Sequence, residues 1–148
     1  MATILAHITI RPGCEGRFEQ IAAELHRTTH ANEQGTRAYG YWRGAAPRQY
    51  YTLLSFDDFL TFIAHQTSEY HETASPALGS VIEAIKLEWV DPVQRASTLV
   101  PTVSQAVPED ADELTKKYAV RFAAEIADWW LPLRSGAVLH HDGNTKEQ

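Results

Sequence analysis

The stretch ILAHITIRPGCEGRFEQIAAEL, residues 4–25, decides the fold because its hydrophobic period changes partway along. Residues 3–11 alternate between apolar and polar side chains, which predicts a strand that Pro12 and Gly13 bring to an end. From Cys14 to Glu33 the apolar side chains recur at helical spacing, which predicts an amphipathic helix. The residues on the inner side of the predicted strand are Ile4, Ala6, Ile8 and Ile10, and those on the helix are Phe18, Ile21, Ala22 and Leu25.

The next segments continue this alternation of element types. Residues 37–43 and 49–56 predict two strands joined by a hairpin loop. Asp57 or Asp58 caps a predicted second helix that runs to about Thr67. Ser68 begins another helical segment, Ser75 with Pro76 starts a further short one, and residues 85–90 form the last strand. The order β-α-β-β-α-β over residues 1–95 predicts an α+β protein of the ferredoxin-like kind.

Residues 96–148 form an extension with a different composition. Residues 96–108 are rich in Pro, Ser and Thr, as linkers are, and residues 109–131 predict one amphipathic helix that Pro132 ends. The apolar side chains of this helix are Leu114, Tyr118, Phe122, Ile126 and Trp129. A stripe this apolar predicts docking on the first domain, of the same chain or of a partner, where it covers a pocket mouth. A polar tail follows from Ser135.

Composition excludes several classes of protein. The 148 residues are 44% hydrophobic and carry a net charge of −6, which argues against nucleic acid and anionic membranes as partners. A single cysteine, Cys14, allows neither an intrachain disulfide nor a cysteine-rich zinc site. With no signal peptide and no long apolar run, we expect a cytoplasmic protein.

Two short segments resemble a known family. Ser55-Phe56-Asp57-Asp58 followed by FIAHQTSEYH, residues 62–71, is similar to the antibiotic biosynthesis monooxygenase family, and Arg11-Pro12-Gly13 after the first strand agrees with it. The resemblance covers about residues 2–92. It implies a homodimer in which two ferredoxin-like sheets face each other as an α/β barrel. Each subunit then keeps a pocket between its sheet and its helices.

The resemblance also implies a set of activities. Some members oxygenate anthrones or quinols of aromatic polyketides with O₂ and no metal or flavin, others degrade haem, and others act on small signalling molecules. The polyketide oxygenases carry Asn and Trp where this chain has Thr52 and Phe56, and the haem-degrading members have Asn and Trp where it has Ala6 and Phe56. These departures argue against haem degradation and remove the best-known polar group of the polyketide oxygenases. The resemblance as a whole, with the absence of any cofactor motif, still leads us to expect a cofactor-independent monooxygenase for a quinol, an anthrone or a similar polyketide-type aromatic. The alternatives are a non-catalytic small-molecule-binding dimer and a haem-binding or haem-degrading protein.

The candidate catalytic residues are His65 and His71, because a histidine at a pocket can remove a proton from a phenol or enol at neutral pH. In one continuous helix His65 and Ser68 would share a face and His71 would point elsewhere, but a break near Ser68 would turn His71 toward the same cavity. Ser68 is otherwise only a helix cap, and the histidines only solvated. The pairs His65 with Glu69 and His26 with His30 supply two ligands each, so we expect no metal site.

Aromatic side chains gather on the two central strands and the helix after them. If Phe56 faces the helices, strand alternation places Tyr50 and Thr52 there too, while His7 looks into the barrel between subunits. A flat aromatic substrate would stack in such a pocket, with hydroxyl groups holding its oxygens. The predicted substrate-binding residues are Tyr50, Thr52, Phe56, Phe62 and Ser68.

Overall fold

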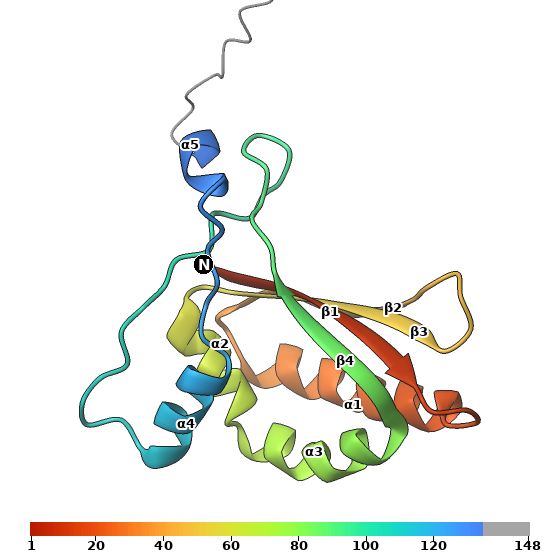
Figure 1. Cartoon of the computed structure of the whole chain (residues 1–148). Coiled ribbons are helices and arrows are strands. Elements are labelled where there is room, and N and C mark those ends of the chain that lie inside the picture. Colours follow the sequence, from red (N-terminus) through yellow and green to blue (C-terminus); the bar gives the residue numbers. More distant parts are fainter. Residues whose placement is uncertain (135–148) are drawn as a thin grey trace, which may run out of the picture.

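The computed structural model describes residues 1–134, and its centre is a four-stranded antiparallel sheet in the order β2-β3-β1-β4 (Figure 1). The strands are β1 (Ala2–Ile10), β2 (Thr36–Arg43), β3 (Gln49–Phe56) and β4 (Ile82–Trp89). Three helices alternate with the strands along the chain. Helix α1 (Glu15–Asn32) follows β1, and α2 (Phe59–Gln66) and α3 (Glu69–Val81) lie between β3 and β4. The expected ferredoxin-like α+β arrangement is confirmed.

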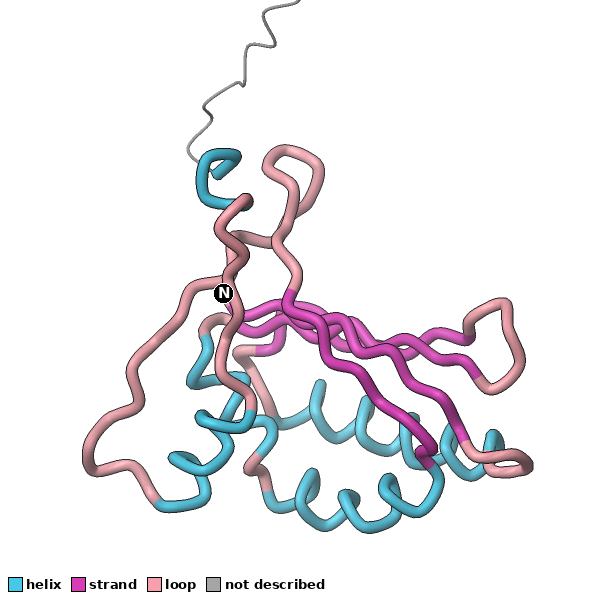
Figure 2. Tube along the Cα trace, in the orientation of Figure 1, coloured by secondary structure: helices cyan, strands magenta, loops and turns pink. Residues whose placement is uncertain are grey.

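The helices cover only one face of the sheet (Figure 2). The inner residues of β1 are at most 4% exposed, and Phe18 of α1 and Phe62 of α2 are as deeply buried against them. Burial of apolar surface contributes about 25 cal/mol for each Å² removed from water, so this layer holds the sheet to its helices. The alternation seen in the first strand therefore sets which face of the sheet is the core.

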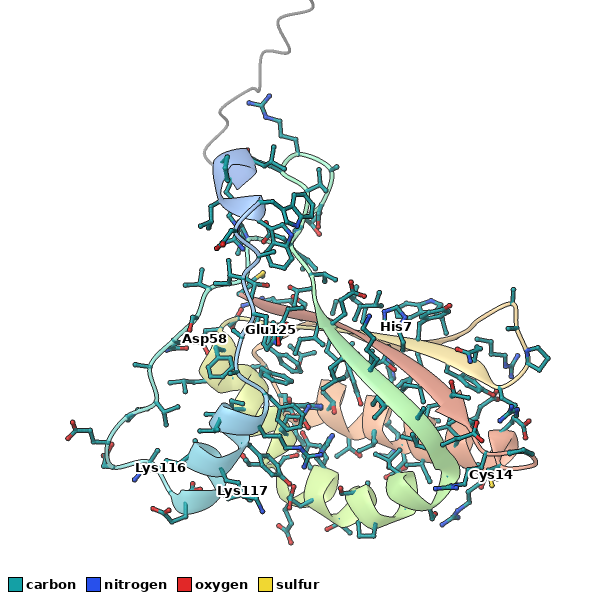
Figure 3. The ribbon with its side chains drawn as sticks, in the orientation of Figure 1. His7, Cys14, Asp58, Lys116, Lys117 and Glu125 are labelled. Carbon is teal, nitrogen blue, oxygen red and sulfur yellow. The ribbon has the colours of Figure 1, made fainter. Side chains whose placement is uncertain are left out.

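The uncovered face carries His7, Tyr51 and Trp42, and Figure 3 shows His7 on the side turned away from α1 and α3. His7 Nε2 lies 2.8 Å from a carboxylate oxygen of Glu88, and its ring meets the ring of Tyr51 edge-on at 5.6 Å. The predicted orientation of His7 away from the core is confirmed. Trp42 is 54% exposed, which is unusual for so large an apolar side chain.

Two boundaries in the second half of the domain differ from the prediction. No new helix starts at Pro76, which lies inside α3. A proline inside a helix removes one backbone hydrogen bond and crowds the carbonyl four residues earlier, yet α3 runs through Pro76 from its cap at Ser68 to the buried Val81. Strand β4 begins at Ile82, three residues earlier than expected, because it pairs with Ile10 across a bulge.

The prediction of one helix over residues 109–131 was wrong. The structure has two short helices, α4 (Glu113–Arg121) and α5 (Trp130–Arg134), with Pro132 inside the second. Asp112 caps α4 by accepting a hydrogen bond from the Thr115 N–H at 2.8 Å. The helix stops where Phe122 packs on Phe62, after which the chain turns away to α5. Tertiary contacts here override a sequence that contains no helix breaker before Pro132.

The segment before α4 is packed and not a free linker. The Thr102 side chain is fully buried, and its hydroxyl donates to the Val90 carbonyl at 3.1 Å and accepts from the Thr3 N–H at 3.3 Å. The Val103 N–H also donates to the Met1 carbonyl at 3.0 Å, a normal length for such a hydrogen bond. The extension is thus fastened to the first strand before it reaches α4.

Further along, Arg134 of α5 forms a bidentate pair with Asp91. The expected polar tail, with His140 and His141, lies outside the described residues. Within residues 1–134, no helix is long and apolar enough to cross a membrane.

Candidate functional site

A cavity of about 430 Å³ lies between the sheet and the helices, within the range of roughly 300–1,000 Å³ that small-molecule sites occupy. The inner face of the sheet forms its floor, α2 and α3 form one wall, and the end of α4 forms another. Most of this lining is aliphatic and aromatic. Its polar side chains include Tyr39, Tyr41, Thr52, His65 and His71.

His65 is the most deeply placed titratable group of the cavity. Its side chain is fully buried, and its Nδ1 lies 3.0 and 3.1 Å from the two carboxylate oxygens of Glu33. An ionised carboxylate only accepts hydrogen bonds, which assigns the ring hydrogen to Nδ1 and leaves a lone pair on Nε2 of the neutral ring. That Nε2 is buried and has no hydrogen-bond partner.

Glu33 itself is held at the end of α1. It is the C-cap residue of that helix, and its carboxylate also accepts a hydrogen bond from the Tyr70 hydroxyl of α3. The carboxylate that orients His65 is therefore fixed by two helices. A carboxylate at Nδ1 is one of the ways in which proteins fix the orientation and tautomer of a histidine ring.

His71 reaches the same cavity from the next helix. Helix α2 ends at Gln66, and Ser68 caps α3 by accepting from the His71 N–H at 3.4 Å. This break is the one that the sequence suggested, and it brings the rings of His65 and His71 to 5.0 Å between centroids. Burial, and after it the neighbouring His65, lower the pKa of His71 to about 4, so this histidine is neutral at pH 7.

Two tyrosines of β2 line the sheet side of the cavity. The hydroxyls of Tyr39 and Tyr41 lie 2.7 Å apart, and the Tyr39 ring meets the His65 ring edge-on at 5.2 Å. Burial raises the pKa of Tyr41 to about 12 and that of Tyr39 still further. Both phenols therefore stay protonated at neutral pH, and because one of them donates to the other, the pair has one O–H left to donate to an anion in the cavity.

Of the five predicted substrate-binding residues, Thr52 and Phe62 line this cavity. Thr52 Oγ1 is buried without a hydrogen-bond partner, as are His65 Nε2 and His71 Nδ1. Buried polar atoms are normally paired, so these three atoms, from the floor and the helical wall of the cavity, are available to hydrogen-bond a polar ligand. The predicted face of the third strand is confirmed, because Tyr50, Thr52 and Phe56 are all buried on the helix side.

The other three predicted residues are not part of the cavity lining. Tyr50 donates to Glu19 at 2.8 Å and lines an open hollow between α1 and β2, because its position nearer the hairpin carries it past the cavity. Phe56 lies behind His65, with ring centroids 5.0 Å apart. The Ser68 hydroxyl is used up as a helix cap and in donating to the His65 carbonyl at 2.8 Å. A ligand in the cavity would therefore not contact these three residues directly.

Sequence reasoning missed Glu33 and Tyr70. Glu33 is separated from His65 by 32 residues, and no local spacing joins them. The one available signal was an acidic residue at a helix C-terminus, where the helix dipole favours a basic one. A carboxylate at the C-terminus of a helix is unfavourable unless another group compensates it, and for Glu33 that group is His65.

Metal-ligating groups do not gather anywhere in residues 1–134: no three His, Cys, Asp or Glu side chains lie where they could hold one ion. The His26 and His30 rings do lie 4.3 Å apart, as their spacing suggested, but without a third ligand.

Comparisons with known proteins agree with this architecture. The family model of antibiotic biosynthesis monooxygenases matches residues 1–77. A candidate antibiotic biosynthesis monooxygenase from Caulobacter crescentus is 23% identical, with a TM-score of 0.60, over 63% of this chain and 90% of that one. Rv0793 from Mycobacterium tuberculosis is 15% identical, with a TM-score of 0.59, over 65% of this chain and 98% of that one. PA3566 from Pseudomonas aeruginosa is 20% identical, with a TM-score of 0.56, over 60% of this chain and 90% of that one. No curated protein matches the chain.

Proposed function

Because this chain belongs to the antibiotic biosynthesis monooxygenase family, we propose that it oxygenates a flat phenolic or enolic aromatic, of the anthrone or quinol type, with O₂. The observation that carries the proposal is His65, a buried imidazole that lines an apolar cavity, is oriented by Glu33 and has no hydrogen-bond partner at Nε2. A base in this setting can take a proton from a carbon acid that is itself out of water.

The first step of the mechanism is proton removal. His65 Nε2 takes a proton from a CH₂ group flanked by the aromatic rings, and the Glu33 carboxylate stabilises the imidazolium that forms. The negative charge moves to the substrate oxygen. The remaining O–H of the hydrogen-bonded Tyr39–Tyr41 pair and the Thr52 hydroxyl line the sheet side of the cavity and would hold this oxyanion.

The second step consumes O₂. The electron-rich carbanion transfers electrons to O₂, a C–O bond forms, and the peroxide receives a proton from the histidine. Loss of water from this hydroperoxide breaks the O–O bond and leaves a ketone. In sum, CH₂ and O₂ give C=O and H₂O, so the substrate itself supplies the electrons. No cofactor enters this proposal.

A non-catalytic binding protein is the second candidate. It is favoured by Thr52 and Phe56, which stand where related oxygenases carry Asn and Trp. This reading predicts tight binding of a flat aromatic with no oxygen uptake above the spontaneous rate. Haem binding, the third reading, predicts a Soret band when hemin is titrated into the protein.

We further propose that the protein is a homodimer that pairs the uncovered faces of two sheets as a barrel. The exposed Trp42 and Tyr51 and the half-buried Leu53 on that face support this arrangement. The partners in the proposal are therefore a small aromatic molecule, O₂ and a second copy of the chain.

The test is oxygen uptake with the anthrone dithranol, corrected for its spontaneous oxidation. We expect uptake to fall by about a hundredfold or more in a His65→Ala, His71→Ala double variant, the usual contribution of a general base. His26→Gln, which removes an exposed histidine outside the cavity, serves as the control and leaves uptake unchanged. Equal uptake by the double variant would remove both histidines from the mechanism.

A further inference from the structure

Helix α4 completes the cavity although it lies outside residues 1–77, the part that the family model matches. Tyr118 and Arg121 of α4 and Phe122 at its end line the same cavity as His65. We propose that α4 is the element that selects the substrate, and that Arg121 binds a carboxylate on the aromatic molecule. This inference rests on the proposed function for the identity of the cavity as a substrate site.

Helix α4 is fixed in place by contacts to the family domain. The Tyr118 hydroxyl donates to Glu72 of α3 at 2.5 Å. The ring of Phe122 meets the ring of Phe62 of α2 edge-on at 5.9 Å, and Phe62 stands one helical turn before His65. The helix is thus tied to both elements that carry the histidines. A side chain on it has a defined position relative to them.

The charges around the cavity leave Arg121 available. Arg121 is the only Arg or Lys among the described residues of the lining, and it forms no ion pair within residues 1–134. The two acidic residues of the lining form other contacts: Glu72 accepts from Tyr118, and Glu83 accepts from Arg48 at 2.9 Å.

Two aromatic rings of the same segment hold the guanidinium of Arg121 in place. Its central carbon lies 5.0 Å from the Phe122 ring centroid and 6.0 Å from that of Tyr118. Stacking on aromatic faces satisfies part of the charge and leaves the N–H donors free.

The chemistry of these donors points to a carboxylate. A guanidinium presents parallel N–H groups that match the two oxygens of a carboxylate, whereas a single phenolate oxygen uses only part of the fork. Such a ligand would place its phenolic end at His65 and its carboxylate at Arg121. An aromatic without the acid would fill the same apolar space but would leave the arginine unpaired.

The experiment compares two ligands that differ in one group. Danthron is a dihydroxyanthraquinone, and rhein is the same ring system with one carboxylate added. Both are already oxidised, so binding is measured by calorimetry without any turnover. We expect rhein to bind the full-length protein at least about tenfold more tightly than danthron, as one charged hydrogen-bonded contact provides.

The variants assign this preference to a residue. Arg121→Gln should remove most of the preference while danthron binding stays within about twofold, and Arg121→Lys should keep part of it. Lys117→Gln is the matched control, because Lys117 is an exposed cation on the same helix and does not line the cavity (Figure 3). It should leave the affinity for both ligands unchanged.

Three results would overturn the proposal: equal affinity of the wild-type protein for both ligands, no binding of either, or an Arg121→Gln variant that keeps the preference. A preference that disappears equally in Lys117→Gln would assign it to the net charge of α4 and would also overturn the role of Arg121. Because no step needs catalysis, failed oxygen uptake with dithranol and a failed rhein preference are separate outcomes.

Discussion

The imidazole rings of His65 and His71 lie 5.0 Å apart although the two residues belong to different helices. The cap formed by Ser68 produces this contact, because it ends one helical direction and starts another within two residues. A protonated His71 would be a buried cation next to a second imidazole. The fold is thus built around a neutral His71.

This neutrality predicts a loss of stability in acid. The pKa of His71 is about 4 in the folded protein and near 6.5 when the chain is unfolded, so protons bind the unfolded state more readily between these values. The contribution of the neutral His71 to the free energy of unfolding is fully present above pH 6.5. It declines as the pH falls toward 4, by about 3 kcal/mol in all.

Urea unfolding at pH 7 and at pH 4.5 measures this effect. The difference between the two free energies of unfolding should be smaller in His71→Gln than in the wild type, since all other titrating groups are common to both proteins. Equal differences in the two proteins would mean that His71 is not held neutral by the fold.

A second prediction concerns Glu33 as a positioning residue. If Glu33 sets the tautomer of His65, Glu33→Gln should lower kcat for dithranol oxidation by about a hundredfold and change KM by less than about threefold. Glu69→Gln removes an exposed carboxylate outside the cavity and is the control. A rise in KM with an unchanged kcat would assign Glu33 to the shape of the cavity and not to proton transfer.

The uncovered face of the sheet gives a third prediction. Leu53 pairs with Leu5 across β1 and β3 on this face, so Leu53→Asp should place a charge in the proposed dimer interface and yield monomers. Light scattering coupled to size exclusion measures the mass. Val120→Asp, at an 81% exposed position on α4, should stay dimeric. A monomeric wild-type protein would contradict the barrel.

The docking of α4 gives a fourth prediction. Phe122→Ala removes the ring that packs on Phe62 and should lower the free energy of unfolding by about 2 kcal/mol, less than a fully buried phenylalanine because Phe122 is only half-buried. Val120→Ala on the exposed side should change it by less than about 0.5 kcal/mol. Equal effects of the two substitutions in a thermal or urea melt would show that α4 packs only loosely.

The sequence predicted the fold well because the decisive signals are local. The alternation around Ile8 and the helical spacing around Phe18 each depend on neighbours a few residues away. The same holds for the cap at Ser68, which made the meeting of His65 with His71 one of the two arrangements expected from the sequence.

The parts that were not predictable depend on distant contacts. Glu33 meets His65 across 32 residues, and nothing in the spacing of either residue indicates the other. The prediction of one helix over residues 109–131 failed for the same reason, because the helix ends where Phe122 packs on Phe62. Tyr50 was placed on the correct face, but how far along the strand the cavity extends depends on where α3 and α4 sit.

The construction of the cavity from two stretches of chain has a consequence for engineering. The proposed proton-transfer residues come from the family domain, while Tyr118, Arg121 and Phe122 come from a nine-residue helix and the residue after it. Exchanging that helix for a library of sequences that keep the Tyr118 contact to Glu72 would vary ligand choice and leave the sheet untouched. Chemistry and recognition can then diverge at separate rates in descendants of this chain.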